Sequence, residues 1–186
     1  MSRDLDGREE LIMKKVAVLN PAFRSPILVD VGMAMVATTK TQFVARNRFV
    51  LDTKASAVVK ISYLEPDFSK WFLSKREMPF VGSTLHYKEL SFYSIDGPII
   101  EELGGKEMVE TTLAEIFSLI EKQPNGEPGS LLTNGNANIF YVKDVDGVLR
   151  VVLVSWHRGG WSFHANPVMD RYGWGCKSRV FARKLP

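Results

Sequence analysis

The chain alternates hydrophobic and polar residues most regularly between positions 138 and 167. Two turn signals, Asp146-Gly147 and Gly159-Gly160, divide this stretch into three runs rich in Val, Ile, Leu and aromatic residues. Glycine and aspartate tolerate the positive φ angles that tight hairpin turns require. The pattern therefore predicts a three-stranded antiparallel β-meander.

The second hairpin of this meander has one apolar and one polar face. A two-residue turn at Gly159-Gly160 places Trp156 opposite Phe163, and side chains alternate between the faces with a period of two. The apolar face then consists of Val152, Val154, Trp156, Trp161, Phe163 and Ala165, and the polar face consists of Ser155, His157, Ser162, His164 and Asn166. The first hairpin is apolar on both sides, so we expect it to be covered on both faces.

A helix is predicted from about Thr112 to Gln123, immediately before the meander. Thr112 and Glu115 have the spacing of a capping box, and one apolar stripe follows the helical period. The stripe consists of Val109, Leu113, Ile116, Phe117 and Ile120, whereas Glu110, Glu115, Glu121 and Lys122 lie outside it and are expected to be solvated. We expect this helix to cover one face of the sheet.

Short β-branched runs between residues 16 and 64, including TQFVARNRFVLDT, predict three or four further strands. Gly32 inside one run indicates a bulge or a close backbone approach, although helix competes for residues 32–38. Pro66-Asp67 and Asp96-Gly97-Pro98 are typical helix starts, and a last strand is expected at Ser178–Arg183.

These elements predict an α+β fold with antiparallel sheets and one main amphipathic helix packed against a C-terminal β-meander. Residues 1–12 form an arm or frayed helix, and Met13 is an alternative start. Residues 13–123 form a strand-rich α+β region that ends in the amphipathic helix, and residues 124–186 form the meander. QPNGEPGS is the best linker candidate, with one continuous domain as the alternative.

Composition places the chain among globular proteins. It has 186 residues, of which 45% are hydrophobic and 24% charged, with a single cysteine, Cys176. No apolar run approaches 18 residues, and the N-terminal stretch is too charged for a secretory signal. We therefore expect a cytoplasmic protein that does not span a membrane and carries no disulfide.

Candidate catalytic residues are few. Ser155, His157 and His164 share the polar face of the second hairpin, where Ser beside His would suit acyl transfer if a carboxylate oriented the imidazole. No such carboxylate is visible in the meander, and an ordinary solvated face explains the pattern equally well. Cys176 has cationic neighbours that would lower the thiol pKa. The spacing of His157, His164 and Cys176 fits no known zinc motif, so we expect no metal and no cofactor.

A basic, aromatic C-terminal surface is the other candidate site. Residues from Ala137 onward include eight Lys and Arg against three Asp, and aromatic residues lie between the cations. This combination stacks bases and binds phosphates, although core packing accounts for several of the aromatic residues. The candidates for a binding surface are Arg171, Tyr172, Trp174, Lys177, Arg179 and Arg183.

Several stretches of the sequence together resemble those of a known protein family. They are TTLAEIFSLIEKQPNGE, LLTNGNANIFYVKDVDGVLR, the Gly-Gly-Trp turn, Trp174-Gly175 and Arg179-Val180-Phe181, with VLNPAFRSPILVDVGMA in the N-terminal half. They resemble a family of uncharacterised proteins from candidate-phyla bacteria. The resemblance covers nearly the whole chain and implies a bacterial, cytoplasmic origin, but no activity, cofactor or site residue.

No motif in the sequence assembles a nucleophile, a base and an orienting group. We therefore expect a small soluble bacterial protein with a binding or protein-interaction role, whose partner is another protein or a second copy of the chain. Nucleic-acid binding through the C-terminal surface is one alternative. A small enzyme with Cys176 or the Ser155/His157/His164 face as its site is the other.

Overall fold

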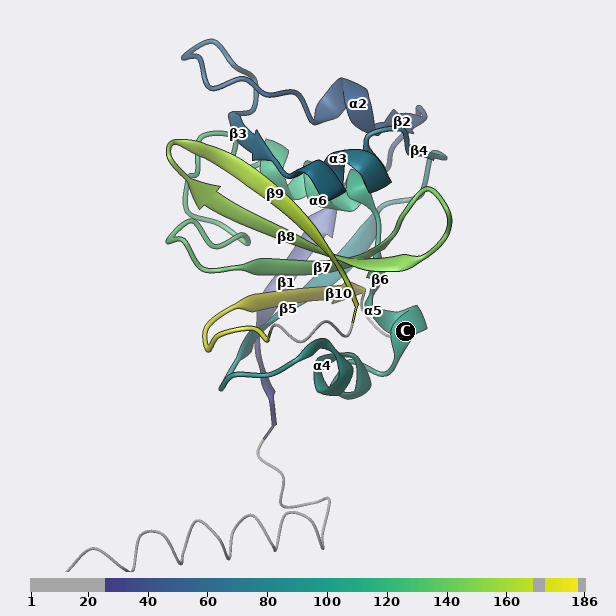
Figure 1. Cartoon of the computed structure of the whole chain (residues 1–186), viewed down its shortest axis with the longest axis vertical. Coiled ribbons are helices and arrows are strands. Elements are labelled where there is room, and N and C mark those ends of the chain that lie inside the picture. The colour runs from purple at the N-terminus through teal and green to yellow at the C-terminus, as the bar shows by residue number, and fades with distance from the viewer. Residues whose placement is uncertain (1–25, 169–172, 184–186) are drawn as a thin grey trace, which may run out of the picture.

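The structure is a computed structural model that describes residues 26–168 and 173–183. It is a mixed α and β fold with a mostly antiparallel sheet and few helices (Figure 1). The strands are β1 (Leu28–Val36), β2 (Phe43–Val44), β3 (Ile61–Leu64), β4 (Arg76–Glu77), β5 (Ser83–Leu90), β6 (Glu110–Thr111), β7 (Asn138–Lys143), β8 (Leu149–His157), β9 (Gly160–Pro167) and β10 (Arg179–Arg183). The helices are α2 (Ala45–Arg48), α3 (Pro66–Phe72), α4 (Asp96–Glu102), α5 (Lys106–Val109) and α6 (Leu113–Glu121). The expected arm at residues 1–12, the alternative start at Met13 and the candidates Arg171 and Tyr172 lie outside the described residues.

The main sheet combines strands from both ends of the chain. Within the described residues its order is β1-β5-β10-β7-β8-β9-β3, and β6 also pairs with β7. Neighbours are antiparallel except for β10 with β7, β3 with β9 and β6 with β7. The four strands that follow Pro124 lie side by side between β5 and β3, which both precede it, so the loop after α6 does not separate two sheets.

The hairpin between β8 and β9 turns one residue earlier than the sequence predicts. Arg158 and Gly159, with φ angles of 53° and 76°, are its central residues. Trp156 consequently lies opposite Trp161, so the predicted pairing with Phe163 is wrong. A turn shifted by one residue moves each cross-strand partner by two, which leaves every side chain on the face expected for it.

Gly160 is needed for packing and not for the turn. It is the first residue of β9, and a Cβ atom built on it would lie 2.8 Å from the backbone nitrogen of Ser62. Ser62 belongs to β3, the neighbouring strand. The second glycine therefore allows β3 to approach β9 closely, while Arg158 accepts the positive φ angle in the turn.

We expect Gly160→Ala to destabilise the protein by about 1–3 kcal/mol, because the added methyl group meets the backbone of Ser62 and a flexible side chain cannot relieve the contact. Urea unfolding measures this loss. Gly175→Ala is the matched control, since no atom lies within 4 Å of its added Cβ. Equal stability of the two variants would contradict the role assigned to Gly160.

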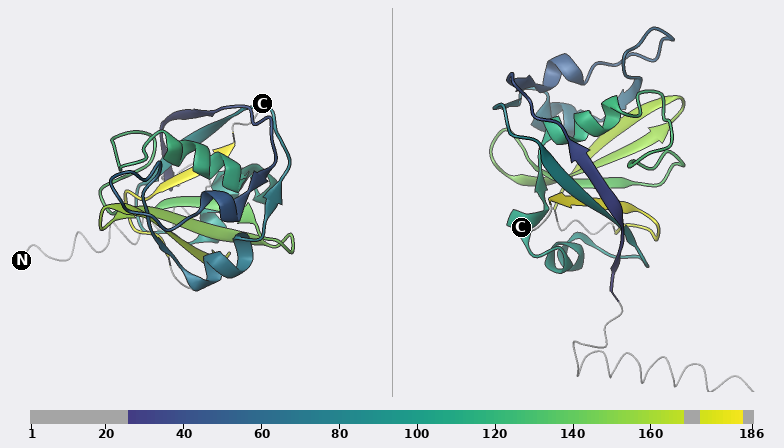
Figure 2. Two further views of the ribbon diagram at one scale, coloured as in Figure 1. Left: turned by 90° about the horizontal axis from the view of Figure 1, so that it is seen from above. Right: turned by 180° about the vertical axis from the view of Figure 1, so that it is seen from behind.

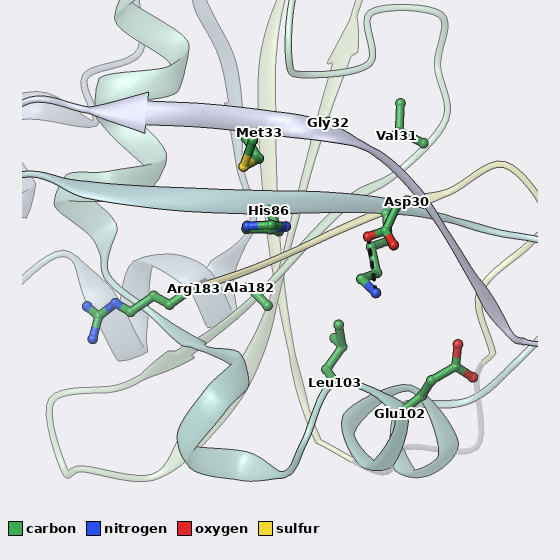
Figure 3. Close-up of a pocket in the computed structure, with 10 residues that line it drawn as sticks. Asp30, Val31, Gly32, Met33, His86, Glu102, Leu103, Ala182 and Arg183 are labelled. Carbon is green, nitrogen blue, oxygen red and sulfur yellow. Dashed lines mark ion pairs between the residues drawn. The ribbon is translucent and has the colours of Figure 1, made fainter. Parts of the chain in front are cut away.

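Gly32 lies at a bulge in β1, as one of the two sequence interpretations predicted. The register between β1 and β5 shifts between Asp30 and Gly32, so Val31 is the extra residue (Figure 3). A Cβ atom on Gly32 would also lie 2.5 Å from the hydroxyl oxygen of Tyr87. The competing prediction of a helix over residues 32–38 is wrong, because residues up to Val36 pair with β5.

The strand predicted from TQFVARNRFVLDT is largely wrong. Only Phe43 and Val44 form a strand, and the helical turn α2 follows at once. This turn buries Phe43, Ala45 and Phe49 together, and the ring of Phe49 lies 5.4 Å from that of Phe117 in α6. Burial against α6 therefore overrides the β propensity of the local sequence.

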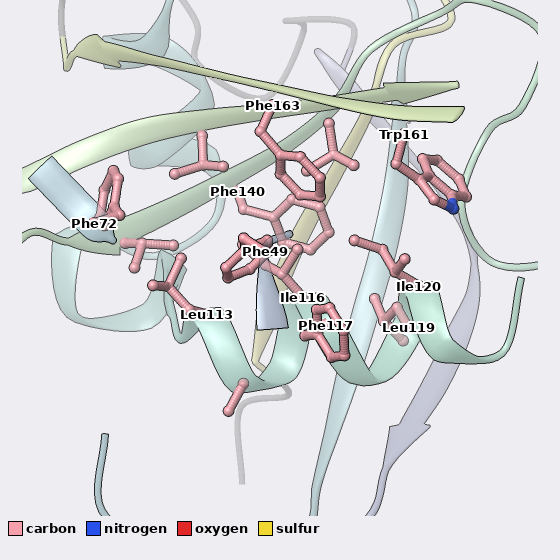
Figure 4. Close-up of a cluster of buried hydrophobic side chains, with 14 of the residues drawn as sticks. Phe49, Phe72, Leu113, Ile116, Phe117, Leu119, Ile120, Phe140, Trp161 and Phe163 are labelled. Atoms are coloured by element: carbon pink, nitrogen blue, oxygen red, sulfur yellow. The ribbon is translucent and has the colours of Figure 1, made fainter. Parts of the chain in front are cut away.

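The sheet has a hydrophobic core on each face. Helices α3 and α6 cover the first core, which includes Phe140, Trp161 and Phe163 (Figures 2 and 4). Helices α4 and α5 lie on the opposite side and cover a second, smaller core around Ile139 and Val180. The two cores leave the face of β1 and β5 beside α4 only partly covered.

The amino-terminal end of α6 is held by two carboxylates from different parts of the chain. The carboxylate of Glu77 accepts hydrogen bonds from the backbone N–H groups of Leu113 and Ala114 at 3.0 and 2.8 Å. Burial raises the pKa of Glu77, and these two N–H groups together with Lys75 oppose the increase. The helix thus begins with its first amides satisfied by side chains.

Glu115 completes the predicted capping box with Thr112, but the expectation that it is solvated is wrong. Its side chain is fully buried and accepts hydrogen bonds from Ser83 at 2.6 Å and from Arg183 at 3.2 Å. The helical pattern places Glu115 outside the apolar stripe. It does not reveal that β5 and β10 bring a hydroxyl and a guanidinium to that side of the helix.

We expect Glu115→Gln to destabilise the protein by about 2–3 kcal/mol, because it removes the charge that pairs with Arg183 and disturbs a fully satisfied buried network. Thermal and urea unfolding measure the change. Glu121→Gln on the same helix is the control, since its ion pair with Arg48 is half exposed and contributes at most about 1 kcal/mol. Similar losses in both variants would count against the buried network.

Candidate functional site

The polar face of the second hairpin brings the predicted serine and histidine candidates near one another, but in separate contacts. The hydroxyl oxygen of Ser155 lies 2.8 Å from that of Ser162. Nδ1 of His164 lies 3.8 Å from Oε2 of Glu65, which also accepts the backbone N–H of Ala165. Glu65 is a carboxylate near His164 that the sequence did not reveal, because it comes from the segment between β3 and α3, but 3.8 Å is too long for a hydrogen bond that would orient the imidazole. The hydroxyls bind each other, which does not activate a nucleophile.

His157 lies at the outer end of this face, and Cys176 lies apart from it. His157 is exposed at the end of β8, and its carbonyl oxygen accepts a hydrogen bond from Ser62. Cys176 is exposed, and its thiol donates to the carbonyl oxygen of Ser91 at 3.2 Å. Among residues 26–168 and 173–183, no group of three His, Cys, Asp or Glu side chains is arranged to hold a metal ion.

Two arginines of the predicted binding surface form ion pairs within the protein, one buried and the other exposed. Arg179 is buried, donates to Glu89 and to the carbonyl oxygen of Ser130, both at 2.6 Å, and lies over the ring of Tyr87. Arg183 pairs with Glu115. The guanidinium of Arg179 is therefore not free to bind a phosphate, and that of Arg183 is exposed but already paired with a carboxylate.

The other described candidates differ in exposure. Trp174 is half-buried, and its indole N–H donates to Asp96 at 2.7 Å. Lys177 is exposed, with a positive φ angle of 67°. The described part of the predicted basic surface therefore includes one cation that is freely exposed and others that stabilise the fold.

A pocket lies between α4 and the face of β1, β5 and β10 that the second core leaves partly uncovered (Figure 3). Its volume is about 530 Å³. It is lined by Asp30, Val31, Gly32, Met33, His86, Lys88, Glu102, Leu103, Ala182 and Arg183. The sequence interpretation singled out only Gly32 and Arg183 among these residues, and neither for a pocket.

His86 and Lys88 form the polar part of the pocket floor. They point to the same face of β5, because they are two residues apart on one strand. Met33 and Ala182 lie opposite His86 on the two neighbouring strands. The Nε2 atom of His86 is buried and has no hydrogen-bond partner among the described residues.

A buried polar atom without a partner costs about 1–3 kcal/mol. The Nε2 atom of His86 is therefore an unusual feature of a pocket whose other polar groups are engaged. A polar group of a bound molecule that reached this nitrogen would remove the cost. An unpaired buried group in a native structure calls for an explanation, such as a water, an ion or a functional role.

Lys88 and Asp30 form an ion pair at the rim of the pocket. The ammonium group of Lys88 lies 3.1 Å from Oδ1 of Asp30, and the two residues face each other across β5 and β1. The Asp30 side chain is 76% exposed and the Lys88 side chain 25% exposed. The aspartate is therefore largely solvated, whereas the lysine lies mostly against the sheet.

Helix α4 is a fixed wall of the pocket because it is attached at both ends. At its start, the buried carboxylate of Asp96 accepts hydrogen bonds from the Tyr141 hydroxyl at 2.9 Å and from Trp174. Burial raises the pKa of Tyr141, and the neighbouring Asp96 charge raises it further. At its end, the two carboxylate oxygens of Glu102 accept the backbone N–H groups of Ile27 and Leu28 at 2.8 and 2.9 Å. The pocket is therefore preformed.

We expect Glu102→Gln to loosen the attachment of α4 to β1, since an amide can accept only one of the two N–H groups and turns a donor toward the other. Hydrogen exchange of the Ile27 and Leu28 amides should become about tenfold faster. Glu101→Gln, at the exposed neighbouring position, is the control. Unchanged protection of both amides in Glu102→Gln would show that the carboxylate does not hold the helix.

Comparison of the chain with protein-family models, with curated proteins and with solved structures finds no significant match in any of the three. Among the described residues, no helix is both long and apolar enough to cross a membrane. Function is therefore argued from the pocket and its chemistry.

Proposed function

We propose that the protein is a non-catalytic binding module of the bacterial cytoplasm, and that it binds a small molecule in the pocket beside α4. The observation that carries this proposal is the buried Nε2 of His86, which has no partner among the described residues and belongs to a residue of the pocket floor. The single cysteine and the resemblance noted in the sequence support the cytoplasmic location.

The size and lining of the pocket support this role. Small-molecule sites usually have volumes of about 300–1,000 Å³ and combine apolar walls with a few polar groups that fix orientation. Here the apolar contacts come from Val31, Met33, Leu103 and Ala182, and the polar groups come from His86 and the Lys88–Asp30 pair. Because α4 is fixed at both ends, binding would require little reorganisation.

Two observations favour binding over catalysis and over nucleic acid. The described lining residues include no serine, threonine or cysteine that could act as a nucleophile beside His86. Arg179 and Arg183 form internal ion pairs, which removes two of the cations that a nucleic-acid surface would use. Binding of a small molecule in the pocket requires neither a nucleophile beside His86 nor the two arginine cations.

We expect Met33→Trp to block binding, because Met33 is 59% exposed and its larger replacement can turn into the pocket with little effect on folding. Ligand-detected NMR with a diverse set of small polar and apolar compounds measures binding. Compounds that bind the wild-type protein in the pocket should show no NMR binding signal with the Met33→Trp variant.

Met35→Trp is the matched control for this experiment. Met35 lies on the same strand, is 75% exposed and does not line the pocket. Compounds that bind the wild type and Met35→Trp but not Met33→Trp support the proposed function. A screen without any compound sensitive to Met33→Trp would refute it.

A further inference from the structure

The charges of the pocket differ in how far they are available to a ligand. Both oxygens of Glu102 accept backbone N–H groups, and the guanidinium of Arg183 binds Glu115 on the other side of the sheet. Among the described lining residues, this leaves Lys88 and Asp30 as the charged groups that pair with each other within the pocket. They have opposite signs and lie 3.1 Å apart.

This pair disfavours a ligand with a single charge. An anion that bound Lys88 would displace Asp30 and leave that carboxylate close by, without its partner and repelling the ligand. A cation that bound Asp30 would leave Lys88 in the same position. A molecule that carries both charges on neighbouring atoms can pair with both residues at once, so that every charge keeps a partner.

We propose that the pocket binds a small zwitterion of the α-amino-acid type with an apolar side chain. The ligand carboxylate pairs with Lys88, its ammonium group pairs with Asp30, and the imidazole of His86 forms one further hydrogen bond to its polar end. This inference rests on the proposed function and adds the chemical class of the ligand.

The apolar contacts of the pocket fit the other half of such a molecule. Met33 from β1 and Leu103 from the segment after α4 line the pocket from different elements, and Ala182 forms the floor beside His86 (Figure 3). Methionine is flexible and polarisable, so it adapts to side chains of different shape. The pocket should therefore accept several aliphatic or aromatic side chains with modest discrimination between them.

A matched ligand series tests the charge requirement on the full chain. L-Leucine carries both charges, N-acetyl-L-leucine keeps only the negative one and L-leucinamide keeps only the positive one. In NMR titrations of the wild-type protein at neutral pH, we expect each singly charged analogue to bind about tenfold more weakly than leucine, because it leaves one partner of the pair uncompensated. Equal or tighter binding of either analogue would overturn the proposal.

Variants of the ion pair should change the ligand preference and not only the affinity. Asp30→Asn leaves a cation alone in the pocket and should bind N-acetyl-L-leucine more tightly than leucinamide. Lys88→Met keeps most of the length of the side chain, leaves an anion alone and should show the reverse order. Loss of stability cannot produce two opposite preferences, so this result would separate recognition from folding.

Lys143→Met is the control for these variants. It removes one charge from another surface ion pair, with Glu110 at 2.7 Å, which lies outside the pocket. Its order of ligand affinities should equal that of the wild type, and a change in that order would count against the assigned site. If a variant does not fold, the ligand series on the wild type still decides the charge requirement.

The experiments also distinguish failure of this inference from failure of the proposed function. Compounds that bind in a manner sensitive to Met33→Trp, together with no preference for leucine over its analogues, would refute the zwitterion and leave the binding module in place. Absence of any Met33-sensitive binding, from leucine or from the compound set, would refute both.

Discussion

The insertion of β10 between β5 and β7 is the constraint on which the rest of the structure depends. On one side of this strand lie β5 and β1, and on the other lie β7, β8, β9 and β3. The ring of Phe181 stacks on Phe140 at 4.5 Å and packs against Tyr87 at 5.5 Å, which joins the two groups of strands through the first core. Each of the two cores therefore extends across β10, which is the last of the described strands in the sequence.

The charged ends of β10 explain why the basic C-terminal region does not form a free cationic surface. Arg179 is buried, and a buried charge is tolerated only when it is paired and hydrogen-bonded. Arg183, at the other end of the strand, is exposed, but the carboxylate with which it pairs is buried. Glu89 and Glu115 supply these pairs from β5 and α6. The same strand therefore links the sheet, stabilises the start of α6 and contributes Ala182 to the pocket floor.

Local sequence patterns correctly predicted the structural features that are determined by residues close in sequence. Pro66 and the capping box at Thr112 depend on neighbouring residues, and the alternation along β8 and β9 assigned each side chain to a face. Periodicity assigns a side chain to a face of the sheet but does not identify its cross-strand partner. The hairpin turn was therefore placed one residue too late, because Gly160 is required for packing against Ser62, a residue of another strand. The burial of Glu115 and the pocket beside α4 likewise depend on strands that meet only in the folded chain.

The outer edge of β1 bears on the interpretation of the pocket. Val31, Met33 and Met35 are exposed on an edge strand, where apolar side chains favour pairing with another chain. Three features oppose such pairing: the bulge at Val31, the charge of Asp30, and Lys122 of the segment after α6, whose ammonium group donates to the carbonyl oxygen of Met35. These are the devices by which natural sheets prevent strand addition. Since the backbone of the edge is protected in this way, the exposed side chains next to His86 are better explained by a ligand that lies on the face of the sheet than by a strand that extends it.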